Sequence, residues 1–435
     1  MKILIVTAWY APFIHPRAHR WTAVAEHWAS EGHAVHVLTA RVRECGQNET
    51  LQGVQVHRVG FDSLKEWVYY WLGSQGARGR VGRKPEKPSL TLHFTSWLYK
   101  TVWKNMFFPD DACVWYFPAR RKLRQLLDSE TFDAVFTVSL PFTGHLLGLA
   151  TLPTDQSCKT GKPFWLADIG DPFSFQAKLP NNRFFYQKQN RQLEQKVLEK
   201  ADAVTVTTEA TLCKYRELFG EKAVATMRVI PPLLVVQPIV NHHSSLVIGH
   251  SSFVKIGYFG AFYAPTRTPD AFLDLLSQTF ALRPDLRERL KVHFYGEIFP
   301  EFFEKLNHEP GIQLHGLCSR DEVQAAMQQM DILINIGNAT DFQLPSKAVD
   351  YLAAGKTVLN LSYVENDPFV ELFKGNPMLF NLNVENGRVG NHELVRWLAW
   401  LEMEKPSLSR AEIRARIAPF LVERIAKQYL ELINT

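Results

Sequence analysis

Apolar residues along the chain follow two alternating periods, which predict successive strands and helices of an α/β fold. The run ILIV at residues 3–6 is continuously apolar, as expected for a parallel strand that is buried on both faces. Trp21, Val24 and Trp28 recur at the spacing of one helical face, and a second apolar run follows at 34–39. These forty residues therefore predict a βαβ unit with a right-handed crossover.

The alternation continues in the first half of the chain and begins again in the second half. In the first half, further apolar runs predict strands at 133–138, 163–168 and 202–208. In the second half, strands are predicted at 255–260, 291–296, 331–336 and 357–362, and helices at 268–282, 320–330 and from 346 onward. The last helical pattern, 409–433, has Ser409 as its expected cap and Pro419 as an expected kink.

This organisation predicts two domains. A chain of 435 residues is too long for one ordinary core. A stretch with three prolines and a polar cluster predicts a linker at 231–253. We therefore expect two doubly wound, Rossmann-like domains at 1–230 and 254–408, followed by a helical segment at 409–435. In such sheets ligands bind beyond the carboxyl ends of the strands, so a central cleft between the domains is the expected site.

Composition narrows the functional class only slightly. The net charge of +5 is too mild for a dedicated nucleic-acid binder. Five scattered cysteines without a CxxC pair favour free thiols in a reducing compartment. The start MKILIVTAWYAPF leads into a helical pattern instead of a cleavage site, and no apolar run reaches the ~18–20 residues that span a bilayer. We expect a cytoplasmic protein whose contact with membranes, if any, is peripheral.

The stretch DFQLPSKAVDYLAAGKTVL at 341–359 carries the candidate binding chemistry. It follows the strand at 331–336, and a helix start there would offer unpaired N–H groups to a phosphate. Ser346 adds a hydroxyl and Lys347 a charge, while Asp350 lies one turn later on the same face. A carboxylate suits a pair of sugar hydroxyls, so the three residues predict a site for a nucleotide and its ribose. The alternative is a capped helix with an ion pair worth ~0.3–0.5 kcal/mol.

This stretch resembles the nucleotide-sugar site of family-4 glycosyltransferases, which have the two-domain GT-B fold. The family pattern PSK…EYLAAGKPV stands here as PSKAVDYLAAGKTV. The resemblance implies donor binding by Leu344, Pro345 and Ser346, with Asp350 in place of the family's ribose-binding Glu. The family's earlier Glu would fall on Phe342, and Asp341 is one residue away.

Three further stretches agree with this resemblance. GYFGAFYAPTRTPDAFL resembles the strand and phosphate-binding loop that open the second domain, with Gly260 and Arg267 in the matching places. FDAVFTVSLPFTGHLLG and WLADIGDPF resemble first-domain motifs and contain His145 and Asp171. For these two, a structural histidine and a capping or turn acid are the alternatives. The resemblance also implies that the final helix crosses back to the first domain.

The loop after the first strand departs from the family, which often has Gly-Gly there. This chain has YAPFIHPRAHR at 10–20, so Arg17 and Arg20 are expected to supply charge on the acceptor side. The alternative is that both arginines lie on a solvated helix face. No D-x-D motif or metal-ligand spacing occurs in the sequence, and we expect no metal and no cofactor besides the donor itself. Cations must then stabilise the leaving diphosphate, and Arg267 and Lys347 are the candidates.

Together with these features, the resemblance implies a metal-independent, retaining hexosyltransferase that uses a UDP- or GDP-sugar. The expected acceptor is a lipid-linked sugar or polysaccharide of surface-glycan biosynthesis. Residues 64–108 hold ten aromatic residues and eight Lys or Arg against two acids, which favours an anionic membrane surface as a partner. The alternative is a helical pair packed on the core. A sugar-nucleotide epimerase of the same architecture and a catalytically degenerate binding protein are the alternative functions.

Overall fold

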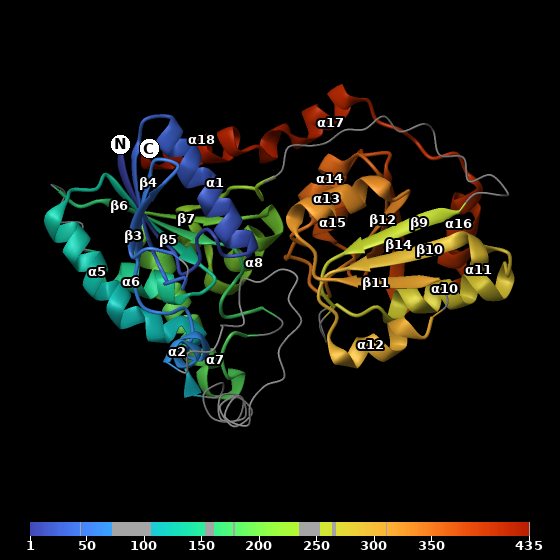
Figure 1. Ribbon diagram of the computed structural model, residues 1–435, viewed down its shortest axis with the longest axis horizontal. Helices are drawn as coiled ribbons and strands as arrows, with labels where there is room; N and C mark the ends of the chain where they lie inside the picture. The colour runs from blue at the N-terminus through green and yellow to red at the C-terminus, as the bar shows by residue number, and fades with distance from the viewer. Residues whose placement is uncertain are drawn as a thin grey trace. The chain divides into compact units, whose positions relative to one another are not determined.

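The computed structural model describes residues 1–43, 45–71, 106–152, 161–176, 179–234, 253–262, 267–309 and 311–434 (Figure 1). The chain forms two compact units. Unit 1 comprises Met1–Val235 together with Leu421–Thr435, and unit 2 comprises Val236–Phe420. None of the described helices is long and apolar enough to cross a membrane.

Unit 1 is built on an eight-stranded sheet in the order β3-β4-β2-β1-β5-β6-β7-β8. All neighbouring strands are parallel except β3, which pairs antiparallel with β4 at the edge. The strands are β1 Lys2–Val6, β2 Ala34–Thr39, β3 Asn48–Leu51, β4 Val54–Arg58, β5 Ala134–Ser139, β6 Phe164–Ile169, β7 Ala203–Val206 and β8 Met227–Val229. The helices are α1 Pro16–Ser30, α2 Leu64–Trp71, η2 Asp111–Trp115, α5 Tyr116–Ser129, α6 Thr143–Thr151, α7 Arg183–Lys200, α8 Glu209–Phe219, α9 Glu221–Val224 and α18 Val422–Ile433.

Strand β1 shows how the sheet of unit 1 is covered on both faces. Leu4 and Val6 belong to a core cluster with residues of α5, α6 and α7. Ile3 and Ile5 alternate to the other face and join a second cluster with residues of α1 and α18. A strand that is buried on both faces must be continuously apolar, which is the pattern that predicted it.

Unit 2 has a seven-stranded sheet in the order β11-β10-β9-β12-β13-β14-β15, parallel except for the antiparallel β14–β15 pair. The strands are β9 Val254–Phe259, β10 Leu290–Tyr295, β11 Ile312–Gly316, β12 Ile332–Ile336, β13 Thr357–Ser362, β14 Leu379–Glu385 and β15 Arg388–Val389. The helices are α10 Asp270–Leu282, α11 Leu286–Arg289, α12 Pro300–Asn307, α13 Arg320–Gln329, α14 Ala348–Ala354, α15 Pro368–Leu372, α16 Asn391–Glu402, α17 Arg410–Ile417 and η3 Ala418–Phe420. The prediction of two doubly wound α/β sheets is confirmed.

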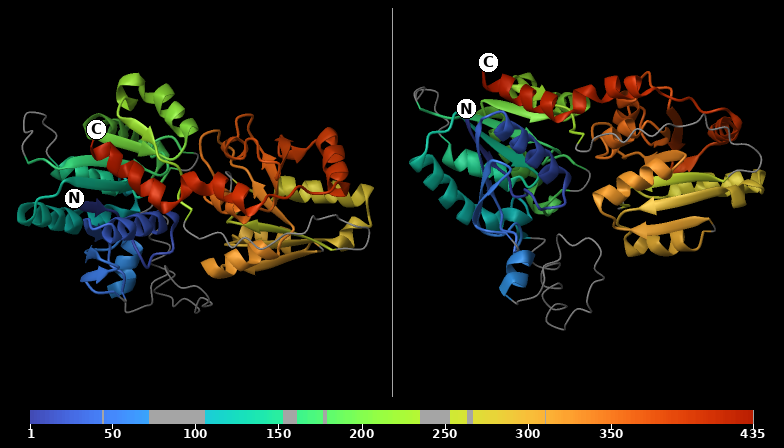
Figure 2. Two further views of the ribbon diagram at one scale, coloured as in Figure 1. Left: turned by 90° about the horizontal axis from the view of Figure 1, so that it is seen from above. Right: turned by 45° about the horizontal axis from the view of Figure 1, so that its top comes forward.

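The final helical segment is divided between the units. Helix α17 starts at a capping box formed by Ser409 and Glu412, and η3 then carries Pro419, which cannot continue an α-helix. Helix α18 lies along α1 in unit 1, where Trp28 donates to the carbonyl of Ala426 at 3.1 Å (Figure 2). The expectation that the last helix returns to the first domain is confirmed for α18.

One helix of unit 2 differs from its prediction. Helix α14 begins at Ala348 and not at Ser346, which lies in a turn, and no side chain caps its start. All seven of its residues are buried. The reason is that α14 packs against α17, with a Cβ on Gly355 falling 2.3 Å from Ile413. Gly355 itself ends the helix in the left-handed conformation, φ 61°.

Candidate functional site

The candidate site of unit 2 lies where β9, β12 and α14 meet. The Tyr351 hydroxyl fixes this junction, because it accepts from the amide of Phe259 at 3.1 Å and donates to the carbonyl of Ile334 at 3.0 Å. These contacts hold α14 against the carboxyl ends of the two central strands, where ligands of open α/β sheets bind. The side chains just before and along α14 are therefore placed at this edge.

Asp350 is the acidic centre of this site. Its side chain is 9% exposed, and its carboxylate lies 3.4 Å from the Lys347 ammonium and 3.8 Å from the Arg320 guanidinium. Arg320 opens α13 after the capping box of Ser319 and Glu322. Its Nε is buried and has no hydrogen-bond partner among the described residues. One carboxylate thus lies between two cations, which leaves the cluster with a net positive charge.

Arg267 is held in the same unit by the loop that follows β12. Its guanidinium donates to the side-chain oxygen of Asn338 at 2.7 Å, and Asn338 in turn donates to the carbonyl of Gln343 at 3.0 Å. Asn338 therefore joins Arg267 to the segment that leads into α14. Arg267 is thus a third cation, held by a hydrogen bond against the loop that leads to Lys347.

The other residues predicted for donor binding have varied surroundings. Asp341 and Ser346 are exposed, Leu344 is half-buried and Pro345 is buried. The amide of Gly260, directly after β9, donates to the carbonyl of Tyr295 at 2.9 Å, so this N–H is already bonded. Contact of these residues with a donor stays a prediction. The site in unit 2 is thus defined mainly by its charged side chains.

In unit 1 the polar centre is Asp168, the penultimate residue of β6. Its carboxylate accepts from Thr205 Oγ1 at 2.7 Å, Tyr429 OH at 2.8 Å and Trp21 Nε1 at 3.1 Å, and it forms an ion pair with Arg17. Burial alone would raise the pKa of Asp168, but the neighbouring guanidinium groups and hydrogen bonds lower it on balance. Asp168 is therefore a buried carboxylate that stays ionised.

The two arginines that were expected on the acceptor side belong to this buried network. Arg17 is 8% exposed and packs over Gly170, where a Cβ would fall 2.7 Å from its guanidinium. Arg20 is 4% exposed and donates to Tyr429 OH and to the carbonyls of Ile230 and Pro231. These contacts join α1 to the sheet and to α18. Direct contact of either arginine with a ligand stays a prediction.

His145 lies on α6 and is completely buried. Its Nδ1 is 2.8 Å from Thr137 Oγ1, whereas its Nε2 has no hydrogen-bond partner among the described residues. Burial lowers the pKa of His145 to about 3, while the charges of Asp168 and Arg17 act in opposite directions. The imidazole is therefore neutral at pH 7. Asp171 is exposed in the loop after β6.

Four residues at these sites were not predicted: Asp168, Arg320, Asn338 and Tyr351. Asp168 ends the predicted strand 163–168, and an acid at the carboxyl end of a buried strand is a usable signal. Arg320 and Asn338 gave no comparable signal, because their partners are distant in the sequence. Across the described residues, no group of three or more His, Cys, Asp and Glu is placed to hold a metal ion.

The chain is similar to known proteins in two ways: a family model matches most of unit 1, and solved structures match both units. Residues 18–232 match the family model of the glycosyl transferase 4-like domain. No curated protein matches the chain in sequence. Among solved structures, the chain is similar over its whole length to HepE from Anabaena in complex with UDP and glucose, with a TM-score of 0.61, 11% identity and 99% of that chain covered.

Two other solved structures show the same architecture. Sucrose-phosphate synthase from Thermosynechococcus elongatus has a TM-score of 0.60 at 12% identity, with 100% of this chain and 98% of that chain covered. The lipopolysaccharide glycosyltransferase WaaG has a TM-score of 0.52 at 12% identity, with 99% and 95% covered. Residues 18–232 thus form a glycosyl transferase 4-like domain, and the two units of the chain have the GT-B fold of these solved structures.

Proposed function

We propose that the chain transfers a hexose from a nucleotide-sugar donor to a lipid-linked or polysaccharide acceptor in surface-glycan biosynthesis. Transfer proceeds with retention of anomeric configuration and without a metal. The bond between the anomeric carbon and the diphosphate oxygen breaks, and its electron pair leaves with the nucleoside diphosphate. A bond forms between that carbon and an acceptor oxygen, whose proton is released.

The cation cluster of unit 2 carries this proposal. Lys347 and Arg320 flank the buried Asp350. Arg267 is hydrogen-bonded to Asn338 on the loop that leads to Lys347. Cations in fixed positions stabilise the charge that develops on a leaving diphosphate, since they need no reorganisation as the bond breaks. Asp350 can accept from the two ribose hydroxyls of the same nucleotide. Lys347 for the diphosphate and Asp350 for the ribose are one helical turn apart, which suits the two neighbouring groups of a nucleotide donor.

Solved complexes of structural neighbours favour UDP as the nucleotide. HepE was solved with UDP and with UDP-glucose, and TarM from S. aureus with UDP. Because identity is only 11%, this likeness supports the fold and suggests which donor to test first. GDP-sugars are the second choice.

Titration calorimetry with UDP and GDP, with and without EDTA, tests the donor site. We expect one of them to bind equally well in EDTA. Lys347→Ala and Arg267→Ala should each lower turnover by ~10²–10³-fold, as loss of one preorganised donor does elsewhere. Lys374→Ala is the matched control, because Lys374 forms an i,i+3 ion pair of similar length with Glu371 on the exposed surface.

Two results would contradict the proposal. Binding of neither nucleotide would remove its main support, and equal turnover in all three lysine and arginine variants would remove the catalytic role of the cluster. Incubation of the UDP-sugar alone separates transfer from epimerisation, since an epimerase needs no acceptor. Formation of an epimer without acceptor would favour the epimerase alternative.

Attachment to an anionic membrane is a further part of the proposal. It rests on the basic and aromatic stretch 64–108, of which only 64–71 and 106–108 are among the described residues. In this part Trp67 is 45% and Tyr70 48% exposed on α2. We expect sedimentation with phosphatidylglycerol vesicles that weakens as salt rises, because each basic residue contributes ~1 kcal/mol at an anionic surface. Binding that is independent of lipid charge would contradict it.

A further inference from the structure

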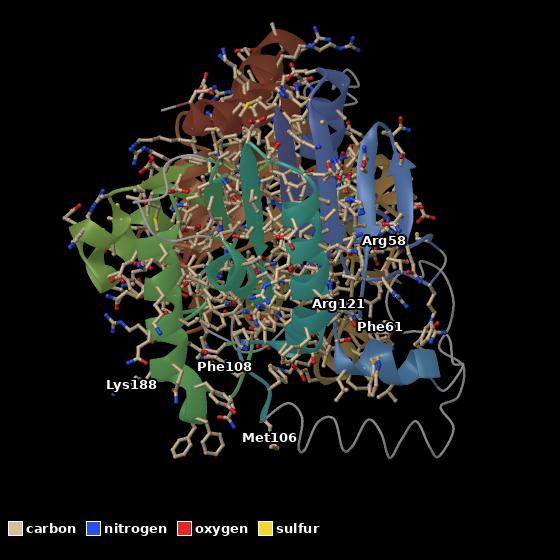
Figure 3. The ribbon with its side chains drawn as sticks, turned by 90° about the vertical axis from the view of Figure 1, so that its left-hand side faces the viewer. Arg58, Phe61, Met106, Phe108, Arg121 and Lys188 are labelled. Carbon is tan, nitrogen blue, oxygen red and sulfur yellow. The ribbon has the colours of Figure 1, made fainter. Side chains whose placement is uncertain are left out.

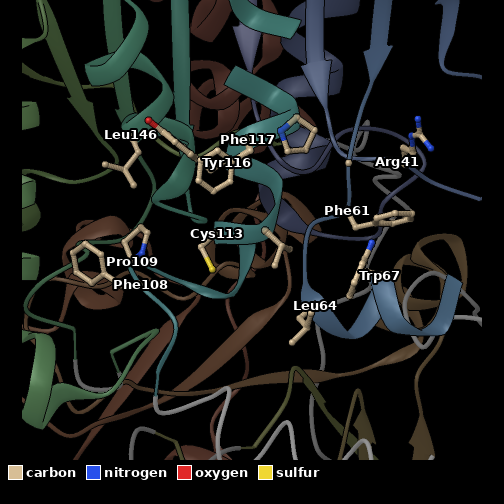
Figure 4. Close-up of a pocket in the computed structure, with 13 residues that line it drawn as sticks. Arg41, Phe61, Leu64, Trp67, Phe108, Pro109, Cys113, Tyr116, Phe117 and Leu146 are labelled. Carbon is tan, nitrogen blue, oxygen red and sulfur yellow. The ribbon is translucent and has the colours of Figure 1, made fainter. Parts of the chain in front are cut away.

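Unit 1 contains an apolar pocket of about 840 Å³ that the sites described above do not use. Phe61, Leu64 and Trp67 lie on one side of it, and Phe108, Cys113 and Phe117 on the other sides (Figure 4). Figure 3 shows Phe61 and Phe108 along the same edge of unit 1. The volume falls within the roughly 300–1,000 Å³ that is typical of small-molecule sites.

The pocket lies on the ligand-binding side of the sheet. Arg41 follows the end of β2 by two residues and Gly60 follows the end of β4 by two residues, and the Arg41 amide donates to the Gly60 carbonyl at 3.0 Å. Both lining residues therefore stand at the carboxyl ends of parallel strands. Ligands of open α/β sheets bind at this edge.

Among the described residues that line the pocket, Arg41 alone is charged. The Arg41 Nε is buried without a hydrogen-bond partner, and the Arg41 guanidinium forms no ion pair with any residue of the described ranges. Arg41 is half-buried, and the usual partner of a guanidinium is a carboxylate or phosphate. The pocket thus combines a large apolar surface with one cation that has no counter-charge.

Two aromatic residues of the pocket are open to solvent, whereas Phe61, Phe108 and Tyr116 are half-buried. Trp67 is 45% exposed and Phe117 is 75% exposed. Large apolar side chains gathered in an open pocket mark a binding site more often than ordinary surface. An apolar chain bound against these rings would gain ~0.8 kcal/mol for each of its methylene groups that is removed from water.

We propose that this pocket binds the apolar chain of an acceptor whose head group carries a phosphate or diphosphate, with Arg41 contacting that head group. The inference rests on the proposed function and names its acceptor as an amphiphilic lipid phosphate. The chain contacts Trp67 and Phe117, and the phosphate accepts from the Arg41 guanidinium. A neutral polysaccharide acceptor would use neither feature.

Linear alkyl phosphates of six to twelve carbons, each below its micelle concentration, are the probes. We expect affinity for the wild-type protein to rise about fourfold for each methylene, which is ~0.8 kcal/mol at room temperature, until the pocket is full. Arg41→Gln should weaken decyl phosphate roughly tenfold or more and leave decanol unchanged, because only the phosphate uses the charge. Arg121→Gln is the matched control, since Arg121 is exposed on α5 outside the pocket (Figure 3).

A second pair of variants tests the apolar wall. Trp67→Ala should weaken both decyl phosphate and decanol roughly tenfold. Phe184→Ala should change neither, because Phe184 is 89% exposed on α7 and does not line this pocket. Trp67 is half exposed, so its loss leaves the core clusters of unit 1 intact, which circular dichroism can check.

Several outcomes would overturn the inference. These are no binding at any chain length, affinity that does not depend on length, or equal losses in the Phe184 and Trp67 variants. Sedimentation with phosphatidylglycerol vesicles that is lost in Trp67→Ala, without binding of monomeric probe, would show a bilayer contact instead. UDP or GDP binding without alkyl-phosphate binding refutes this inference but leaves the proposed function standing. Alkyl-phosphate binding with neither nucleotide bound would refute the acceptor role together with the proposed function.

Discussion

Replacing Tyr429 by Phe removes one hydroxyl from the buried network that holds α18 on unit 1. This hydroxyl donates to Asp168 at 2.8 Å and accepts from Arg20 Nη2 at 2.8 Å and Nε at 3.1 Å. The ring stays in place between Trp21 and Trp28, because phenylalanine has the same shape apart from the oxygen. The substitution therefore tests the hydrogen bonds and not the packing.

The expected loss of stability follows from these contacts. A hydrogen bond to a charged group contributes ~1.5–3 kcal/mol, and this hydroxyl serves two charged groups. Both groups keep other partners, since Thr205 still donates to Asp168 and the carbonyl of Pro231 still accepts from Arg20. We therefore expect unit 1 to lose ~2–4 kcal/mol. For a domain of this size, each kcal/mol lowers Tm by ~2–4 °C.

Unfolding in urea, followed by hydrogen exchange and mass spectrometry, assigns the loss to unit 1. Peptides from α1 and α18 should exchange faster in Tyr429→Phe than in the wild type. Tyr10→Phe is the control, because the Tyr10 hydroxyl is equally buried in unit 1 but has no hydrogen-bond partner in the described part of the chain. Its removal should be neutral or stabilising, since a buried polar group without a partner is itself a cost.

A loss below ~0.5 kcal/mol in Tyr429→Phe would refute this reasoning. So would equal losses in the two tyrosine variants, because the hydroxyls would then contribute alike whether or not they are bonded. A loss of protection confined to unit 2 would show that α18 does not belong to the core of unit 1.

Three other substitutions test separate features. Asp350→Asn should weaken nucleotide binding roughly tenfold by calorimetry, because an amide loses the charge-assisted bonds to ribose; unchanged affinity would exclude ribose contact. The His145 pKa is lowered from 6.5 to about 3, so between these values the unfolded chain binds a proton there that the folded chain does not. Stability therefore decreases as the pH is lowered, by up to ~1.4 kcal/mol per pH unit, and His145→Asn should flatten that slope in urea titrations at pH 4–6; parallel slopes would refute it. Gly355→Ala should cost unit 2 ~1–3 kcal/mol, from the left-handed backbone and the contact with Ile413, and no change in urea midpoint would contradict this.

The fold was predicted where the apolar pattern alone decides the structure. The run predicted at 34–39 has the same bounds as β2, and 357–362 the same bounds as β13. Both strands are almost wholly buried, so apolar residues such as Val35, Val37, Val358 and Leu359 mark them in the sequence. The strands that were not predicted, β3, β4, β8, β11, β14 and β15, are each partly exposed, so their apolar pattern is weaker.

The candidate site was predicted only where its residues are close in sequence. Lys347 and Asp350 are three residues apart, and their ion pair is the one that helical spacing implies. The Arg320 contact to the same carboxylate spans 30 residues, and Tyr429 reaches Asp168 across 261 residues. Side-chain contacts at such separations depend on how the strands and helices pack, which the apolar period does not specify. Arg17 and Arg20 show this most clearly, because a solvated helix face was the stated alternative and both are buried.

The division of unit 1 between the two ends of the chain sets an order on its synthesis. Ile425, Ala426 and Tyr429 are part of the cluster that buries one face of the first sheet, yet they leave the ribosome after all of unit 2. At ~5–20 residues per second, the roughly 200 residues between Val235 and the end of α18 take about 10–40 s to translate. During that time Trp21 and Trp28 on α1 lack the helix that covers them. A nascent chain with this architecture therefore has an exposed apolar face for a chaperone to protect until its last helix arrives.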